Sequence, residues 1–103
     1  MKNPISSYQK LFNSFLLKDF PNISAIEVSK PVFPFSVVGG IRVNFYMKKP
    51  ENDGSEIVDC RYTMYLVKER IEELIKYMTD EKVVVDMYFF YDGALICQDM
   101  INW

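Results

Sequence analysis

The sequence predicts a small α+β fold, in which two helices pack on one face of a curved, mainly antiparallel sheet. Three observations favour this class. A helical apolar stripe opens the chain, strand-like alternation follows it, and a tight turn joins two apolar runs near the C-terminus. We expect the element order α-β-β-β-α-β-β within one domain that spans residues 1–103.

The first helix is predicted to begin after Asn3 and Pro4, since Asn suits a helix cap and Pro suits the first helical position. The Phe20-Pro21 pair predicts its end, because the residue before a proline avoids the α region. Apolar residues at helical spacing form the face that we expect to be buried: Ile5, Tyr8, Leu11, Phe12, Phe15 and Leu16.

Three segments between residues 23 and 48 are predicted as strand, loop and strand. Residues 23–30 form a short strand, and the two prolines of residues 31–35 indicate a loop or an irregular sheet edge. Residues 41–48 alternate clearly. Their inward set is Ile41, Val43, Phe45 and Met47, and their outward set is Arg42, Asn44, Tyr46 and Lys48.

Residues 58–65 also alternate and are predicted as a third strand, joined to residues 41–48 through a turn at residues 50–55. Matching the apolar faces of this hairpin places Asn44 beside Arg61 on the outer side of the sheet. The second helix is then expected over residues 66–79, with its buried stripe at Val67, Ile71, Leu74, Ile75 and Met78.

Asp92-Gly93 between two apolar runs predicts a terminal hairpin with a two-residue type I′ turn, over residues 82–91 and 94–103. Such a turn fixes the register. On the outer side, this register pairs Phe90 with Leu95, Tyr88 with Cys97, Asp86 with Asp99, and Lys82 with Trp103.

Asp86 opposite Asp99 is the main oddity of this predicted hairpin, because like charges across a ladder repel. Three interpretations stay open. The two carboxylates are solvated and screened, or they receive Arg or Lys from a partner protein, or they form a metal or acid–base pair.

The composition excludes several functional classes. The chain has no His, so it lacks the commonest general base and every His-dependent triad, and it has no glycine–lysine phosphate loop. With 14 acidic and 12 basic residues, it lacks the positive excess typical of nucleic-acid binders. We expect no enzyme activity, no metal and no cofactor.

Two observations bear on the compartment. No window approaches the roughly 20 apolar residues of a membrane span. We expect Cys60 and Cys97 to be reduced core thiols, and the protein to be cytoplasmic without membrane association.

Aromatic residues interleaved with charges on the outer sheet side are typical of protein interfaces. We therefore expect a protein-binding module, an adaptor or inhibitor of the kind encoded by phages or mobile elements. The alternatives are a self-associating subunit such as a homodimer, and a partner-specific chaperone; a carboxylate-dependent hydrolase and a single-stranded nucleic-acid binder rank below them. The competing structural reading is that residues 31–35 cover this face. The candidate partner-binding residues are Asp86, Tyr88, Phe90, Asp99, Trp103, Tyr46 and Arg61.

Overall fold

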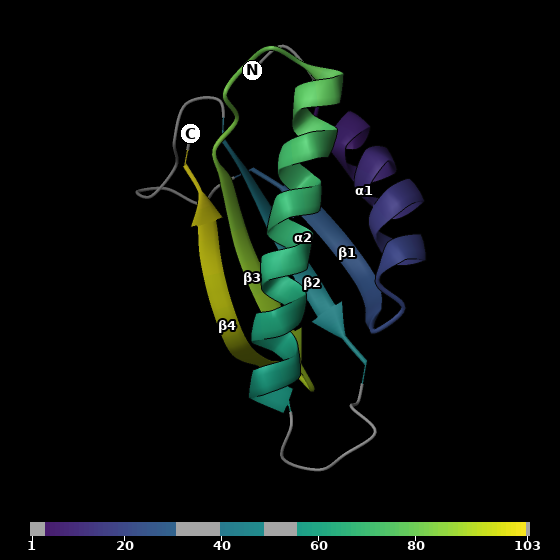
Figure 1. Ribbon diagram of the computed structural model, residues 1–103, viewed down its shortest axis with the longest axis vertical. Helices are drawn as coiled ribbons and strands as arrows, with labels where there is room; N and C mark the ends of the chain where they lie inside the picture. Colours follow the sequence, from purple (N-terminus) through teal and green to yellow (C-terminus); the bar gives the residue numbers. More distant parts are fainter. Residues whose placement is uncertain (1–3, 31–39, 49–55, 103) are drawn as a thin grey trace.

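A computed structural model describes residues 4–30, 40–48 and 56–102 of the chain. Its elements are α1 (Ile5–Asp19), β1 (Ile23–Ser29), β2 (Ile41–Met47), α2 (Glu56–Met78), β3 (Val85–Tyr91) and β4 (Ala94–Ile101). The four strands form an open sheet in the order β1-β2-β3-β4. The outer pairs, β1/β2 and β3/β4, are antiparallel, and the central pair β2/β3 is parallel. Both helices lie on the same face of the sheet (Figure 1), which confirms the α+β class.

The predicted strand over residues 58–65 is wrong, because this segment belongs to α2. Its buried residues Cys60, Met64 and Val67 continue at helical spacing into Ile71, so a single apolar stripe runs across the expected strand–helix boundary. Residue Thr63 is also buried, and its hydroxyl accepts a hydrogen bond of 2.7 Å from the Asn22 side chain. The observed order is therefore α-β-β-α-β-β, with one strand fewer than expected.

This correction changes the partner of β2. The predicted hairpin between residues 41–48 and 58–65 does not exist, and β2 pairs with β1 on one side and with β3 on the other. Helix α2 connects β2 to β3, and a long crossover of this kind is what a parallel pair requires. Both central strands keep the predicted facing, because Ile41, Val43 and Phe45 of β2 and the alternate residues of β3 are fully buried; the latter are Val85, Met87 and Phe89.

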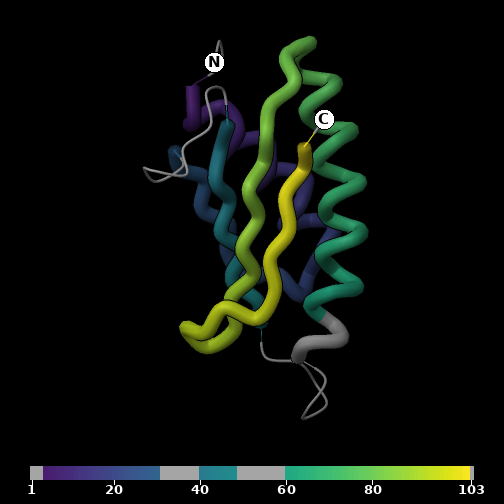
Figure 2. Tube along the Cα trace, turned by 90° about the vertical axis from the view of Figure 1, so that its left-hand side faces the viewer, coloured from purple at the N-terminus to yellow at the C-terminus, as the bar shows by residue number. Residues whose placement is uncertain are grey.

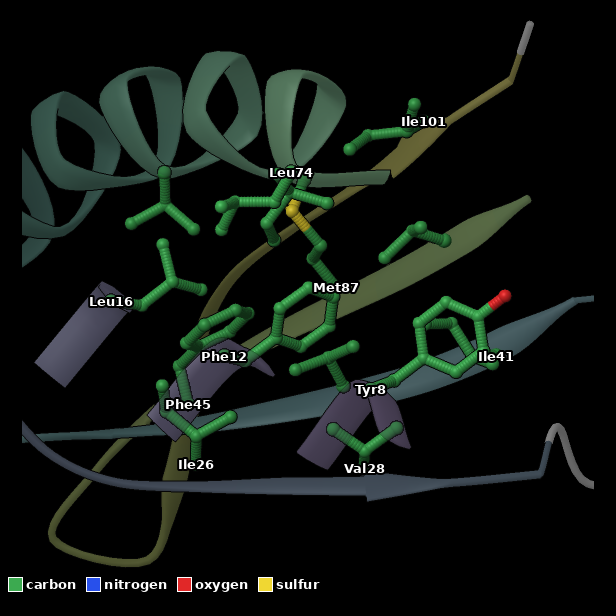
Figure 3. Packing of buried hydrophobic residues seen from close by; sticks show 14 of the residues in the cluster. Tyr8, Phe12, Leu16, Ile26, Val28, Ile41, Phe45, Leu74, Met87 and Ile101 are labelled. Carbon is green, nitrogen blue, oxygen red and sulfur yellow. The ribbon is translucent and has the colours of Figure 1, made fainter. Parts of the chain in front are cut away.

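The core lies between the sheet and the two helices (Figure 3). Helix α1 contributes Tyr8, Phe12 and Leu16, all without exposed surface. Phe15, which the helical stripe placed in the core, is 41% exposed, and the Arg70 guanidinium of α2 lies 5.6 Å from its ring centre. The helix ends at Asp19 with Phe20 as its C-cap, as the following proline predicts. Pro4 occupies the N-cap position, and Asn3 lies outside the described residues.

The terminal hairpin turns at Asp92-Gly93, as predicted, with φ angles of 51° and 79°. The first pairs, Tyr91 with Ala94 and Phe90 with Leu95, also follow the prediction. A β-bulge then inserts Ile96, so that every later pair moves by one residue. Asp99 stands opposite Met87, and the predicted Asp86–Asp99 pair is wrong.

The two cysteines were expected to be reduced, but the structure joins Cys60 of α2 to Cys97 of β4 in a disulfide. Because the bulge turns Cys97 toward the helices, the two side chains come together over a sequence separation of 37 residues. Disulfides persist mainly in oxidising compartments, so this bond counts against the cytoplasmic setting that we expected.

Some expectations concern segments outside the described residues. These are the loop or edge at residues 31–35, the turn at residues 50–55, and Trp103. Within the described part of the chain, no helix is long and apolar enough to cross a membrane.

We expect the Cys60–Cys97 bond to stabilise the fold by restricting the unfolded chain. Adding a reductant should lower the free energy of unfolding by about 2–4 kcal/mol, measured by urea unfolding followed by circular dichroism. The double variant Cys60→Ser/Cys97→Ser is the control and should not respond to reductant. Two titratable thiols in the unreduced protein, with the same unfolding midpoint after reduction, would contradict the bond.

Gly93→Val should destabilise the hairpin, because a β-branched residue resists the positive φ of this position. The expected loss is at least about 1–2 kcal/mol in the free energy of unfolding. Gly93→Asn is the matched control, since Asn tolerates this conformation and an added Cβ meets no atom within 4 Å there. Equal midpoints for the two variants would contradict the assigned turn.

Candidate outer-face binding surface

The sheet surface opposite the two helices is here called the outer face. Alternation and register assign its side chains to three rows across the strands. In Figure 2, β2, β3 and β4 lie side by side, and no described helix crosses in front of them. The first row is Ser29, Arg42, Asp86 and Met100; the second is Glu27, Asn44, Tyr88 and Gln98; the third is Ala25, Tyr46, Phe90 and Leu95.

The third row is apolar and aromatic. The rings of Tyr46 and Phe90 are stacked, with centroids 5.6 Å apart and an interplanar angle of 23°. Leu95 lies across from Phe90 and is 49% exposed, and Tyr46 is 37% exposed. Exposed rings held in one arrangement lose little entropy when a partner covers them, and Tyr is among the residues that anchor interfaces.

The first two rows carry a connected polar network. Tyr88 donates its hydroxyl to Asp86 at 2.8 Å, and the Arg42 guanidinium lies over the Tyr88 ring at 4.1 Å. The Arg42 Nε–H donates to the Asn44 side-chain oxygen at 3.2 Å, and the Asn44 amide donates to Glu27 at 3.0 Å. These contacts link β1, β2 and β3 through side chains and hold the polar groups in fixed directions.

The predicted outer-face residues therefore separate into groups. Asp86, Tyr88, Phe90 and Tyr46 lie together on the outer face, as the alternation indicated. Arg61 does not, because it is exposed on α2 rather than in a strand beside Asn44. Trp103 lies outside the described residues.

Asp99 also leaves the outer face, because the bulge in β4 turns it toward the helices. One of its carboxylate oxygens pairs with the Lys68 Nζ of α2 at 3.1 Å, and the other accepts the Met100 backbone N–H at 2.7 Å. The carboxylate thus bridges α2 and β4. Its place on the outer face is taken by its neighbours in β4, Gln98 and Met100.

Arg42, Asn44, Glu27 and Leu95 were not among the candidate residues, although all four belong to the outer face. Alternation already placed Arg42 and Asn44 outward, so part of the signal was present in the sequence. The role of Glu27 depends on β1 pairing with β2 in register, and no sequence pattern specifies that pairing.

One open edge of the sheet is closed by a side chain. The Gln9 amide of α1 donates to the Ile26 carbonyl at 2.8 Å and accepts the Val28 N–H at 2.8 Å. A neighbouring strand would make the same two bonds, so Gln9 occupies the position of a strand partner along β1. At the other edge, Asp99 holds the Met100 N–H, and the bulge interrupts β4. Both edges are therefore blunted, which favours the face over the edges as a contact surface.

The side chains in the three rows of the outer face supply hydrogen-bond donors and acceptors, the Arg42 cation and stacked rings. Among residues 4–30, 40–48 and 56–102, no group of three or more His, Cys, Asp or Glu side chains could hold a metal ion.

The hydrogen bond from Tyr88 to Asp86 raises the pKa of the Tyr88 phenol above its ordinary value of 10.0, and partial burial adds to the effect. A raised folded-state pKa means that this bond stabilises the fold below pH 10 and that its contribution is lost as the pH rises through the folded-state value.

We expect Asp86→Ala to lower the titration midpoint of Tyr88, because both the acceptor and its charge are removed. Selective ¹³C labelling of tyrosine ring carbons and NMR titration from pH 8 to pH 12 would measure that midpoint. Asp92→Asn is the matched control, because it removes the charge of an exposed carboxylate in the hairpin turn and Asn tolerates the positive φ of this position. A Tyr88 midpoint that does not move in Asp86→Ala would contradict the bond.

Comparison with known proteins does not assign the chain to a family. No protein-family model matches the chain, and no curated protein or solved structure is significantly similar to it.

Proposed function

We propose that this protein is a non-enzymatic protein-binding module that recognises a partner protein through its outer face. The observation that carries the proposal is the stacked Tyr46–Phe90 pair beside exposed Leu95, in the row of the outer face nearest the Asp92-Gly93 turn, on a face that no described helix or strand covers. Exposed apolar residues grouped in one place mark interaction sites more reliably than single exposed ones do.

The composition of the outer face also supports a protein partner. Interfaces enrich Tyr, Phe, Met and Arg, and this face carries Tyr46, Tyr88, Phe90, Met100 and Arg42. A phosphate backbone is a poorer match, because the three rows of the outer face hold two carboxylates, Glu27 and Asp86, and a single cation, Arg42.

A role as an adaptor or inhibitor follows from the same properties. A domain with two blunted edges and one open face binds through that face while its fold stays unchanged. We further propose that a phage or mobile element encodes the protein and that it acts in the cytoplasm. The Cys60–Cys97 bond is the observation that opposes the cytoplasmic location.

A second copy of the chain is the alternative occupant of the outer face. Leu95 and Met100 are 49% and 43% exposed, and both lie on the edge strand β4, where a second copy could cover them. Sedimentation velocity at low micromolar concentration distinguishes the two cases. A monomer supports an external partner, and a dimer that Tyr46→Thr/Phe90→Thr dissociates supports self-association.

The test of the proposal is affinity capture from cells of the source organism with three immobilised proteins. We expect the wild type to retain a specific protein that Tyr46→Thr/Phe90→Thr loses, since Thr keeps β propensity but removes the stacked rings. Tyr62→Ser/Tyr65→Ser is the matched control, because these tyrosines are 66% and 63% exposed on α2, away from the outer face. Retention by the outer-face variant, or loss in the α2 variant alone, would contradict the proposed surface.

A further inference from the structure

The Arg42 guanidinium is the least satisfied charged group on the outer face. Its Nε–H donates to the Asn44 side-chain oxygen, and its Cζ lies over the Tyr88 ring, 4.1 Å from the ring centroid. Among the described residues, its two terminal nitrogens donate no hydrogen bond, and no carboxylate lies within ion-pair distance of them. The other arginine with a ring contact, Arg70, is paired with both Asp19 and Glu73.

The absence of a bond to Asp86 is informative, because Asp86 is the direct cross-strand neighbour of Arg42. The Asp86 carboxylate instead accepts from Tyr88, and Arg42 is drawn over the Tyr88 ring. The Asp86 carboxylate is therefore occupied by Tyr88, and the terminal edge of the Arg42 guanidinium has no hydrogen bond from the part of the chain that the structure describes. An arginine held by its Nε and its flat face presents two parallel N–H donors, the geometry that a carboxylate accepts.

We propose that Arg42 is the receptor for an Asp or Glu carboxylate of the partner protein, which narrows the proposed function to partners that bear an acidic residue. The inference rests on the outer face being the binding surface. Two properties of Arg42 favour it. The guanidinium is a cation that matches one carboxylate, and its contacts with Tyr88 and Asn44 remove part of the entropy cost of ordering an arginine at the interface.

The geometry also constrains where the partner's apolar group must lie. Arg42 and Tyr46 are on the same face of β2, four residues apart, a separation of about 13 Å along the strand. The partner should therefore place its carboxylate on Arg42 and an aromatic or aliphatic side chain on the Tyr46–Phe90 stack. Asp86 lies directly opposite Arg42, and Glu27 lies one row away, opposite Asn44. Their negative charges repel a chain of phosphates more strongly than they repel a single carboxylate.

A phage-displayed library of random 12-residue peptides, selected on the immobilised wild-type protein, tests this inference. We expect the enriched peptides to share an Asp or Glu and an apolar residue. The affinity of a synthesised peptide, measured by fluorescence anisotropy, should fall tenfold or more with Arg42→Gln. A peptide analogue with Asp→Asn or Glu→Gln should bind the wild-type protein as weakly as the original peptide binds Arg42→Gln. The affinity of this analogue should not fall further with Arg42→Gln. Arg70→Gln is the matched control and should bind the peptide as the wild type does.

Each contrary outcome has a distinct meaning. Peptides that lose affinity with Tyr46→Thr/Phe90→Thr but not with Arg42→Gln would overturn the carboxylate receptor and leave the proposed function standing. If neither Arg42→Gln nor Tyr46→Thr/Phe90→Thr weakens the binding of any enriched peptide, both the carboxylate receptor and the proposed function are wrong. A fluorescein-labelled 12-nucleotide oligo-dT tests the alternative ligand. If it binds the wild type more tightly than the peptides do, in a salt-dependent manner, and loses this binding with Arg42→Gln, then the ligand of Arg42 is a nucleic-acid phosphate and not a protein carboxylate. Circular dichroism of each variant confirms that folding is retained.

Discussion

Alternation along the two central strands is the constraint on which the outer face depends. Ile41, Val43 and Phe45 of β2 and Val85, Met87 and Phe89 of β3 are all fully buried against the helices. The stacked Phe45 and Phe89 rings, 4.6 Å apart, hold the two strands in the register that also stacks Tyr46 on Phe90 on the opposite side. A slip of one residue would bury Arg42 and Asp86, so the side chains presented outward are fixed by the side chains packed inward.

The parts of the fold that could be predicted are those with one unambiguous local signal. Strand β2 and the Asp92-Gly93 turn were predicted because strict alternation and positive-φ residues point to a single structure. Residues 58–65 carry two signals at once: they alternate, and they also extend the helical stripe of Ile71 through Met64 and Cys60. The local β propensity of this segment favours a strand. Burial of the continuous apolar stripe against the sheet favours the helix instead, and this packing depends on contacts that are distant in the sequence.

The candidate site was predicted in part for a related reason. Asp86, Tyr88, Phe90 and Tyr46 follow from alternation alone. Asp99 does not, because a single inserted residue in β4 turns Cys97, Asp99 and Ile101 toward the helices and Met100 outward. The bulge permits two contacts that join β4 to α2. These are the Cys60–Cys97 bond and the Lys68–Asp99 ion pair. The disulfide requires Cys60 to lie on α2, so the error at residues 58–65 also concealed this bond. The ion pair does not, because Lys68 lies within the helix predicted over residues 66–79; the error at Asp99 comes from the bulge alone.

The central claim is that the outer face is open to a partner in the free protein, and methionine methyl NMR tests it most directly. Met100 and Met87 lie on opposite faces of adjacent strands, 43% and 0% exposed. When a soluble paramagnetic gadolinium chelate is added to protein labelled with ¹³C-methyl-methionine, we expect strong relaxation enhancement of the Met100 methyl and none of the Met87 methyl. Equal protection of both methyls in the monomer would mean that the outer face is covered, and would contradict the account.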